Sequence, residues 1–387
     1  MKKEIVGEKV PIKLWLDNIE GGALKQVKNL ANLPFAFHHV ALMPDAHEGY
    51  GMPIGGVLAT KNVIVPNAVG VDIGCGMCAQ KTSLRSIDVS ILKRIMSAIR
   101  QAVPLGFRKH EKFQDEKLMP RLKITDGVIQ KEWKNALKSL GSLGGGNHFI
   151  EIQKGSDGYV WIMLHSGSRN LGKQVAEYYD QKAKQECLTR GFDNLVKQGL
   201  SFLDFDSRIG QRYFAEMNTC VEYALANRKL IMERIKQAFV ENVDEKFVWQ
   251  DFINIAHNYA ALERHFGENV LVHRKGATQA QKDQIGIIPG SQGTKSYIVR
   301  GLGNLESFQS CSHGAGRRMG RNQAVRELDL KTEIEKLDRQ GIVHAIRTKK
   351  DLDEASGAYK DISEVMRNQV DLVEILVELS PLAVVKG

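Results

Sequence analysis

The chain has few prolines, few cysteines and no long apolar run, and each shortage excludes a class of protein. Nine prolines in 387 residues, without any low-complexity tract, argue against a disordered chain. No stretch is long and apolar enough to cross a bilayer, and residues 1–9 lack the apolar core of a signal peptide. The five cysteines have no disulfide-framework spacing, which fits a reducing compartment. These shortages favour a cytoplasmic enzyme without a membrane partner.

Basic residues and glycine are what the chain has in excess. Its 54 Lys and Arg against 45 Asp and Glu give a net charge of +9, which favours a polyanionic partner, with nucleic acid first. A hydrophobic content of 43% over this length supports a substantial core in one large domain or two. The 36 glycines cluster in a few polar segments, where the backbone can approach a ligand closely.

Short apolar runs bounded by Gly, Pro and Asn predict strands in the first and last parts of the chain. They are residues 41–45, 55–59, 63–66, 160–164, 270–273, 285–290 and 296–299. Helical spacing of apolar residues predicts a helix over 86–104, a helical block over about 173–265 and a helix after residue 362. The polar segment 107–135 is interpreted as a loop or lid. The glycine-rich loops fall on both sides of the helical block, so a site assembled from distant segments of one α+β fold is expected.

One histidine is followed at once by two closely spaced glycines and then by arginines. Gly314 and Gly316 are the first and third residues after His313, and they let the backbone approach a bulky anion. The arginines, which offer forked donors to phosphate oxygens, are Arg317, Arg318 and Arg321. An imidazole in this setting can attack a phosphorus atom and hold the phosphoryl group covalently. The same pattern also fits a basic surface loop with an incidental histidine, and on these residues alone both interpretations stand.

A second pattern consists of possible metal ligands next to glycine-rich or serine-rich turns. They are Asp72, Cys75, His148, His165 and His273. One carboxylate, one thiol and three imidazoles exceed the needs of one tetrahedral site, whereas two ions that share the thiolate would use them all. Ligand softness alone favours zinc or iron over manganese. For each histidine by itself, a structural role is the simpler explanation.

Other candidate residues carry less chemistry. His257 and His265 are expected on one face of a helix, where no Glu or Cys supports a metal site. Asp45 and His47 are better placed, either to support the ligands or to touch substrate. Cys78 is interpreted as structural, because no second Cys-x-x-Cys pair accompanies it. The segment 289–296 has the glycines and hydroxyls of an anion-binding turn but is not a Walker A loop.

Five motifs together resemble a known family. They are Met43-Pro44-Asp45-Ala46-His47-Glu48-Gly49-Tyr50-Gly51, Val71-Asp72-Ile73-Gly74-Cys75-Gly76-Met77, Gly145-Gly146-Asn147-His148-Phe149, His273-Arg274-Lys275-Gly276-Ala277 and His313-Gly314-Ala315-Gly316-Arg317. In this order they resemble the RtcB RNA-splicing ligases, from about residue 40 to the terminal Val-Val-Lys-Gly. The resemblance implies an RtcB-like fold with mixed β-sheets, in a single domain over 1–387 with the helical block as an insertion.

The resemblance also implies an activity, which is GTP-dependent and Mn²⁺-dependent joining of RNA ends. One end would carry a 2′,3′-cyclic phosphate or 3′-phosphate and the other a 5′-hydroxyl. His313 would take GMP from GTP, and the activated RNA end would then be sealed. Cys75 would bridge two Mn²⁺ ions, one completed by Asp72 and His148 and the other by His165 and His273.

By the same resemblance, several segments would bind the nucleotide. The implied residues are Asn147, His148, Phe149, Ile150, Glu151, His273, Arg274, Pro289, Gly290, Ser291, Gln292, Ser296, His313, Gly314, Ala315, Gly316 and Lys386. Arg169, Arg317 and Arg321 would contact RNA phosphates. The implied partners are RNA with broken or spliced ends, such as tRNA or rRNA, and an activating protein, for a chain that acts as a monomer.

Some positions depart from the family pattern and leave room for other functions. Cys78, Gln292 and Ser312 differ from what the family leads us to expect, and they bear on substrate preference. One alternative is a dinuclear metal phosphoesterase, in which His313 binds phosphate without being modified. Another is an enzyme that caps RNA 3′ ends with guanylate but does not seal them.

Overall fold

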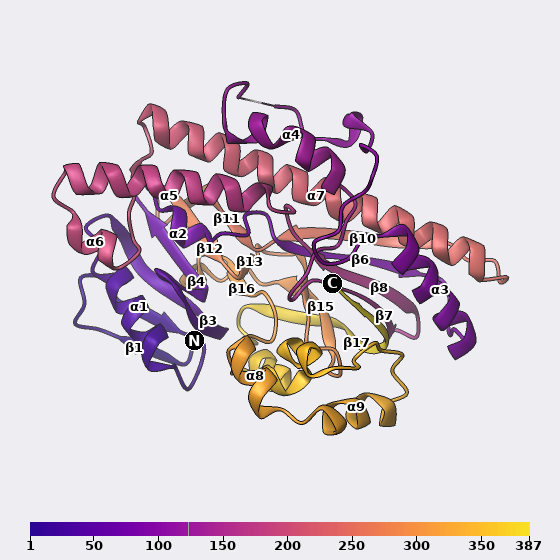
Figure 1. Ribbon diagram of the computed structural model, residues 1–387. Helices are drawn as coiled ribbons and strands as arrows, with labels where there is room; N and C mark the ends of the chain where they lie inside the picture. Colours follow the sequence, from indigo (N-terminus) through magenta and orange to yellow (C-terminus); the bar gives the residue numbers. More distant parts are fainter. Residues whose placement is uncertain (123) are drawn as a thin grey trace.

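Two β-sheets form the framework of the computed structural model, which describes residues 1–122 and 124–387 (Figure 1). The six-stranded sheet has the order β1 (Lys3–Ile5), β2 (Ile12–Leu14), β3 (Ala36–Tyr50), β4 (Met52–Thr60), β12 (Glu268–Lys275) and β11 (Asn258–His265). Within it, β2 and β3 are parallel and the other pairs are antiparallel.

The second sheet has seven strands, and all its neighbours are antiparallel. Its order is β10 (Trp249–Ala256), β6 (Gly76–Thr82), β8 (Val160–Ser166), β7 (Phe149–Gly155), β17 (Val373–Lys386), β15 (Ser296–Gly301) and β14 (Ile285–Ile288). Two short pairs lie outside the large sheets: β13 (Ala277–Gln279) with β16 (Ser310–Ser312), and β5 (Val63–Ile64) with β9 (Leu203–Asp204).

Helices cover the sheets from several directions. They are α1 (Gly21–Ala31), α2 (Pro66–Val69), α3 (Val89–Ala102), α4 (Val128–Ser139), α5 (Leu171–Thr189), α6 (Asp193–Lys197), α7 (Arg208–Asn242), α8 (Arg321–Glu327), α9 (Leu330–Arg339) and α10 (Ile362–Arg367). Short 3-10 turns occur at Glu116–Leu118, Leu305–Ser307, Lys349–Glu354 and Ser356–Ala358. Among the described residues, no helix has both the length and the apolar composition that a membrane crossing requires.

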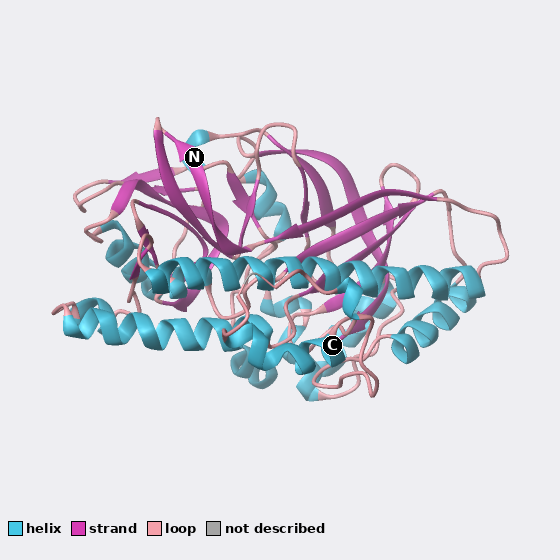
Figure 2. Cartoon of the chain, turned by 90° about the horizontal axis from the view of Figure 1, so that it is seen from above, coloured by secondary structure: helices cyan, strands magenta, loops and turns pink. Residues whose placement is uncertain are grey.

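The long helix α7 ties the two sheets together. It packs against β6, β8 and β10 of one sheet and against β11 of the other, with α5 beside it (Figure 2). Its N-terminus is capped by Ser207, whose hydroxyl accepts a hydrogen bond from the Gly210 N–H at 3.1 Å. The buried face includes Tyr213, Met217 and Cys220, which follow one another at helical spacing.

A single residue separates strands that belong to different sheets. Strand β10 ends at Ala256 in the seven-stranded sheet, and β11 begins at Asn258 in the six-stranded sheet, so His257 lies at the crossing. Its backbone N–H donates to the Cys75 carbonyl at 2.8 Å, and its carbonyl accepts from the Ala277 N–H at 3.3 Å. The two sheets therefore meet beside Cys75.

The α+β class with mixed sheets is confirmed, and the strands expected from the apolar runs overlap β3, β4, β5, β8, β12, β14 and β15. The helices expected over 86–104 and after 362 are present as α3 and α10. In α3 the buried stripe is Leu92, Ile95, Met96 and Ile99, which is the spacing of an amphipathic helix.

Two expectations about secondary structure are wrong in part. Residues 249–265 of the expected helical block form β10 and β11, because pairing with β6 and β12 outweighs the local preference of residues such as Ala260, Ala261 and Leu262. The expected loop over 107–135 contains the first turns of α4, whose apolar face includes the buried Ile129. Residue 123 of that segment lies outside the described residues.

Candidate functional site

Four side chains that are far apart in the sequence meet where four strands of the seven-stranded sheet begin or end. Cys75 precedes β6, His148 precedes β7, His165 lies near the end of β8, and His257 follows β10. In an antiparallel sheet the end of one strand lies beside the start of the next. The registers Gly76 to Ser166 and Phe149 to His165 therefore bring these residues together.

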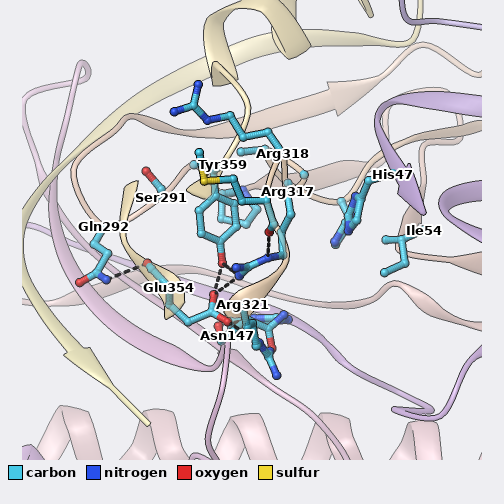
Figure 3. A pocket seen from close by; sticks show the side chains of 18 of the residues that line it. His47, Ile54, Asn147, Ser291, Gln292, Arg317, Arg318, Arg321, Glu354 and Tyr359 are labelled. Carbon is cyan, nitrogen blue, oxygen red and sulfur yellow. Dashed lines mark hydrogen bonds and ion pairs between the residues drawn. The ribbon is translucent and has the colours of Figure 1, made fainter. Parts of the chain in front are cut away.

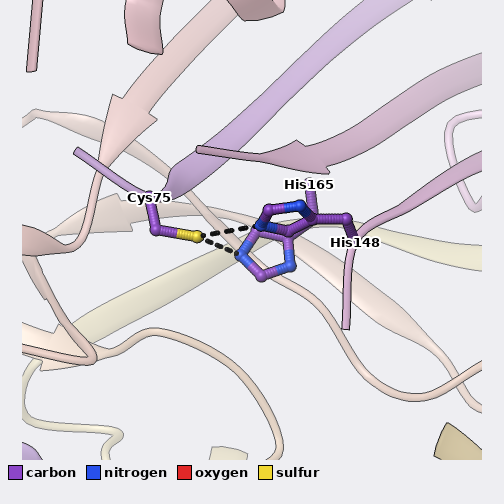
Figure 4. Close-up of side chains that lie close together, drawn as sticks. All are labelled: Cys75, His148 and His165. Atoms are coloured by element: carbon purple, nitrogen blue, oxygen red, sulfur yellow. Dashed lines mark hydrogen bonds between the residues drawn. The ribbon is translucent and has the colours of Figure 1, made fainter. Parts of the chain in front are cut away.

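The side chains of His148 and His165 converge on the Cys75 sulfur (Figure 4). Cys75 Sγ lies 3.1 Å from His165 Nε2 and 3.5 Å from His148 Nε2. His257 Nε2 lies 3.3 Å from His165 Nε2, and Asp72 Oδ2 lies 3.4 Å from His148 Nε2. One thiol, one carboxylate and three imidazole nitrogens thus face one small volume.

The tautomer of His165 leaves its Nε2 with a lone pair that faces the cluster. Its Nδ1–H donates to the Asn147 carbonyl at 3.0 Å, which leaves a lone pair on Nε2. That lone pair faces His257 Nε2. Burial, together with neighbouring positive charge, lowers the pKa values of His165 and His257 well below the usual range, so both rings are neutral. Neutral nitrogens that point at one another and at a thiol could hold a cation.

The acidic members of the cluster fit the same interpretation. Burial and the Asp72 charge raise the pKa of the Cys75 thiol well above its usual range, so a cation is needed to make the thiolate at neutral pH. Partial burial raises the pKa of Asp72, but the hydrogen bond and charge of His148 outweigh it and lower the pKa to about 2. Asp72 is therefore ionised. The buried, positively charged Arg228 offsets part of the negative charge of the cluster, and its Nη1 donates to the carbonyls of Gly74 and Ser166.

His273 does not reach this cluster, although the sequence placed it among the ligands. Its Nε2 accepts from the Val65 N–H at 3.0 Å, and its Nδ1 lies 3.2 Å from the carbonyls of Leu58 and Leu271. Both ring nitrogens are therefore engaged by the backbone inside the six-stranded sheet. His257 occupies the place in the cluster that was expected for His273.

The side chain of His313 is held by Asp45. Its Nδ1 lies 2.6 Å from Asp45 Oδ2, and the same oxygen accepts from the N–H groups of His313 and Gly314 at 3.1 and 3.2 Å. Asp45 is fully buried; burial raises its pKa, but the charges of His313, His47 and Lys360 outweigh this and lower it. A carboxylate at this distance favours the tautomer of His313 with its proton on Nδ1, which leaves a lone pair on Nε2.

The turn after His313 depends on a glycine. Gly316 has a φ of +73°, and a Cβ at this position would lie 2.1 Å from the Asp45 carbonyl oxygen. Any side chain would push the turn away from Asp45. The glycines of this motif therefore position the histidine, in addition to opening space for a ligand.

His313 and the metal-ligand cluster border one cavity of about 760 Å³ (Figure 3). The ring centroids of His257 and His313 are 4.9 Å apart. Of the residues expected to bind nucleotide, the cavity is lined by Asn147, Phe149, Glu151, Pro289, Gly290, Ser291, Gln292, His313, Gly314, Ala315, Gly316 and Lys386. The nucleophile candidate thus shares its cavity with His165 and His257 of the cluster.

Five of the expected nucleotide-binding residues do not line the cavity. His148 faces Cys75, and Ile150 packs in the core on the other side of the sheet. His273 is bonded to backbone, and Arg274 is paired with Glu263 at 2.5 Å. Ser296 does not face the cavity. Its hydroxyl accepts a hydrogen bond from the Gly290 N–H at 3.1 Å and so supports the turn that begins at Pro289.

The arginines after His313 are organised by Glu354. This buried carboxylate lies 3.0 Å from Arg317 Nη1 and 2.9 Å from Arg321 Nε, and it accepts from the Tyr359 hydroxyl (Figure 3). Sequence analysis missed Glu354, because its segment gives no motif. Arg169 lies elsewhere, with Nη2 donating to the Gly106 carbonyl at 3.2 Å beside the loop of His148.

A buried acid and a half-buried lysine lie on the neighbouring wall. Burial raises the pKa of Glu151 to about 8, against the charge of Lys386 and the hydrogen bond from Gln153 at 2.7 Å. Burial lowers the pKa of Lys386, the last residue of β17. Its Nζ lies 5.7 Å from the centre of the Phe149 ring. Pairing of Lys386 with Phe149 between β17 and β7 brings the C-terminal segment to the cavity.

Known proteins resemble this chain over nearly its whole length. Residues 26–126 and 119–387 match the family described as tRNA-splicing ligase RtcB. The RNA-splicing ligase RtcB of Escherichia coli K12 is 39% identical, over 98% of both chains. The tRNA-splicing ligase RtcB of Thermococcus kodakarensis is 32% identical, over 94% of this chain and 91% of the relative. The chain belongs to the RtcB family.

Proposed function

We propose that this protein is an RNA ligase that uses GTP and Mn²⁺ to join a 3′-phosphate or 2′,3′-cyclic phosphate end to a 5′-hydroxyl end. The names of its relatives support RNA joining. The observation that carries the chemistry is the 2.6 Å contact of His313 Nδ1 with Asp45, in a cavity shared with the Cys75 cluster. This contact leaves His313 Nε2 free to act as a nucleophile.

The donor set around Cys75 fits two metal ions. Asp72 and His148 would hold one ion and His165 and His257 the other, with the Cys75 thiolate shared between them. His257 replaces His273 in this assignment. Bound metal would supply Lewis-acid stabilisation of phosphate oxygens. The carboxylate and imidazoles suit Mn²⁺ as well as zinc, and the choice of Mn²⁺ rests on the family.

In the proposed reaction GTP is a substrate. His313 Nε2 attacks the α-phosphorus, so that an N–P bond forms while the bond to pyrophosphate breaks. Asp45 balances the positive charge that develops on the imidazole, as a buried carboxylate does in other His-dependent enzymes. Where the RNA end is a 2′,3′-cyclic phosphate, water first breaks the bond to the 2′-oxygen and gives a 3′-phosphate and a 2′-hydroxyl. An oxygen of the RNA 3′-phosphate then displaces His313 and takes the GMP. The 5′-hydroxyl finally displaces GMP and forms the phosphodiester.

The other polar groups of the cavity would bind phosphates and the guanine nucleotide. Arg317 and Arg321 are held in place by Glu354, so their remaining N–H groups are preorganised for phosphate oxygens. Lys386 adds a further positive group on the neighbouring wall, and Gly290 and Gly314 leave backbone close to the ligand. Glu151 offers a carboxyl to a base or sugar in the same cavity.

We further propose that residues 1–387 act as one ligase domain, as a monomer in the cytoplasm, with an activating protein that aids turnover. The contacts of α7 with both sheets support the single domain. A metal phosphoesterase and a capping enzyme without sealing remain the alternative outcomes of the following test.

The test uses two labelled RNA strands, one with a 3′-phosphate and one with a 5′-hydroxyl. Wild-type protein with GTP and Mn²⁺ is expected to give a joined strand, and His313→Ala is expected to give none. Hydrolysis of the phosphate without GTP would indicate a phosphoesterase instead. Accumulation of guanylylated 3′ ends without any joined strand would indicate a capping enzyme.

A further inference from the structure

Phe107 is the most exposed aromatic residue that the structure describes. Its relative exposure is 101%, so the ring is as open to water as in an extended chain. Other exposed phenylalanines have a neighbour over the ring, as Lys138 Nζ lies 5.3 Å from the centre of Phe113. No described residue forms a ring contact with Phe107. The face of this ring is therefore free to stack on a partner.

The two residues after Phe107 are exposed cations. The side chains of Arg108 and Lys109 form no hydrogen bond or ion pair with any residue that the structure describes. Unpaired cations next to an open ring favour a partner that offers both negative charge and a flat apolar face. A single nucleic-acid strand offers both, because every nucleotide has a phosphate and a base.

The segment is fixed in place by backbone hydrogen bonds. Gly106 N–H donates to the Gly144 carbonyl at 3.0 Å, and the Gly106 carbonyl accepts from Arg169 Nη2 at 3.2 Å. Arg108 N–H donates to the Leu105 carbonyl at 3.2 Å and closes a turn with Phe107 inside it. The ring is therefore presented from a rigid turn, which lowers the ordering cost of binding.

The anchor point of this turn belongs to the loop of the metal-ligand cluster. A Cβ on Gly144 would lie 2.3 Å from His148 Nδ1 and 2.1 Å from Arg169 Nη1. Two residues further on, a Cβ on Gly146 would lie 2.8 Å from Arg321 Nη2. The turn of Phe107 is thus tied, through the Gly106–Gly144 and Leu143–Pro104 backbone hydrogen bonds, to the loop where the cluster and these arginines meet.

We propose that Phe107 is a stacking platform for a base of the RNA strand whose phosphate end enters the cluster, with Arg108 and Lys109 on the adjoining phosphates. This inference rests on the proposed RNA-joining function. Single-stranded ends carry unstacked bases, and stacking on an aromatic ring accepts any base. Phe107 therefore positions the strand and takes no part in the transfer of GMP to His313.

The experiment measures binding of a 3′-phosphate RNA strand by Phe107→Ala, Phe107→Trp and the matched control Phe113→Ala. Phe107→Ala is expected to weaken RNA binding roughly 5- to 150-fold, because a stacked base contributes about that factor. Phe107→Trp and Phe113→Ala are expected to bind within about twofold of wild type. Guanylylation of His313 without RNA should be unchanged in all three, which separates this proposal from the proposed function.

A series of strands with one abasic site near the 3′ end identifies the stacked base. When the abasic site replaces the stacked base, the strand should bind wild type as weakly as the intact strand binds Phe107→Ala. The same abasic strand should bind Phe107→Ala no more weakly than it binds wild type.

Because the ring is fully exposed, thermal unfolding of the variants should match wild type. Equal RNA affinity of wild type and Phe107→Ala overturns the proposal, as does an equal loss with Phe113→Ala. If wild-type protein does not become guanylylated on His313, the proposed function is overturned instead.

Discussion

Asp45 Oδ2 lies 2.6 Å from His313 Nδ1 and also accepts the backbone N–H groups of His313 and Gly314. One buried carboxylate oxygen thus fixes both the ring and the turn that carries it. We predict that Asp45→Asn slows transfer of GMP to the protein by roughly 10³- to 10⁴-fold, because the amide no longer enforces the reactive tautomer. The measurement is the single-turnover rate with labelled GTP.

The control for Asp45→Asn is Asp206→Asn, an exposed aspartate on the loop before α7. This variant should react at the wild-type rate. A rate for Asp45→Asn within threefold of wild type would show that the carboxylate does not set the tautomer of His313.

The metal assignment exchanges the roles that were expected for two histidines. His257→Ala should weaken metal binding by more than about tenfold, because a group in the cluster is lost. His273→Ala should leave the metal content unchanged but lower the free energy of unfolding by about 1–3 kcal/mol, since buried hydrogen bonds to Val65 and Leu58 are lost. Elemental analysis of both purified variants and their denaturant unfolding test this. The reverse pattern would return His273 to the metal site.

Local motifs at strand ends explain which site residues could be predicted from the sequence. Cys75, His148 and His165 stand beside glycine-rich or serine-rich turns at strand ends, and the structure brings all three together as expected. His313 is likewise in the cavity with the residues of its own turn. Local patterns were sufficient here, because each residue belongs to a motif with its own glycines.

His257 could not be found in this way. Its neighbours have the apolar spacing of a helix, and only pairing with β6 and β12 makes them strands. His273 stands in a basic, glycine-flanked motif, but its side chain points into the six-stranded sheet. Glu354 has no motif at all, and its role follows only from the position of Arg317 and Arg321. These three assignments depend on tertiary contacts.

Metal binding should release a proton from the shared thiol. Burial and the Asp72 charge hold the pKa of Cys75 well above its usual range, whereas the lowered pKa values of His165 and His257 leave these rings neutral. The apparent metal affinity should therefore rise about tenfold per pH unit between roughly pH 6 and 8. Titration calorimetry in buffers of different ionisation enthalpy measures the released proton. A pH-independent affinity would mean that Cys75 does not bind metal as a thiolate.

Stability should also depend on pH through Glu151. Burial raises its pKa to about 8, so the protonated acid favours the folded state below the unfolded pKa of about 4.5, and this contribution is lost as pH rises to about 8. Glu151→Gln should remove this loss and be more stable than wild type at pH 8 by a few kcal/mol, since one pKa unit corresponds to about 1.36 kcal/mol. Urea unfolding at pH 5.5, 7 and 8.5 measures the difference.

The matched control for Glu151→Gln is Glu245→Gln, which replaces an exposed carboxyl between α7 and β10. Its unfolding curve should follow wild type at all three pH values. Parallel pH profiles for wild type and Glu151→Gln would mean that Glu151 is ionised in the folded protein, with Lys386 as its ion-pair partner.

Covalent attachment of GMP to His313 is the central claim, and peptide mass spectrometry tests it most directly. Wild-type protein is incubated with GTP and Mn²⁺ without RNA, digested at neutral or alkaline pH because a phosphoramidate is acid-labile, and compared with His313→Ala. The account predicts a GMP adduct on the peptide that contains His313 and no adduct in the variant. Joined RNA formed by a protein that carries no GMP on His313, or GMP found on another residue, would contradict it.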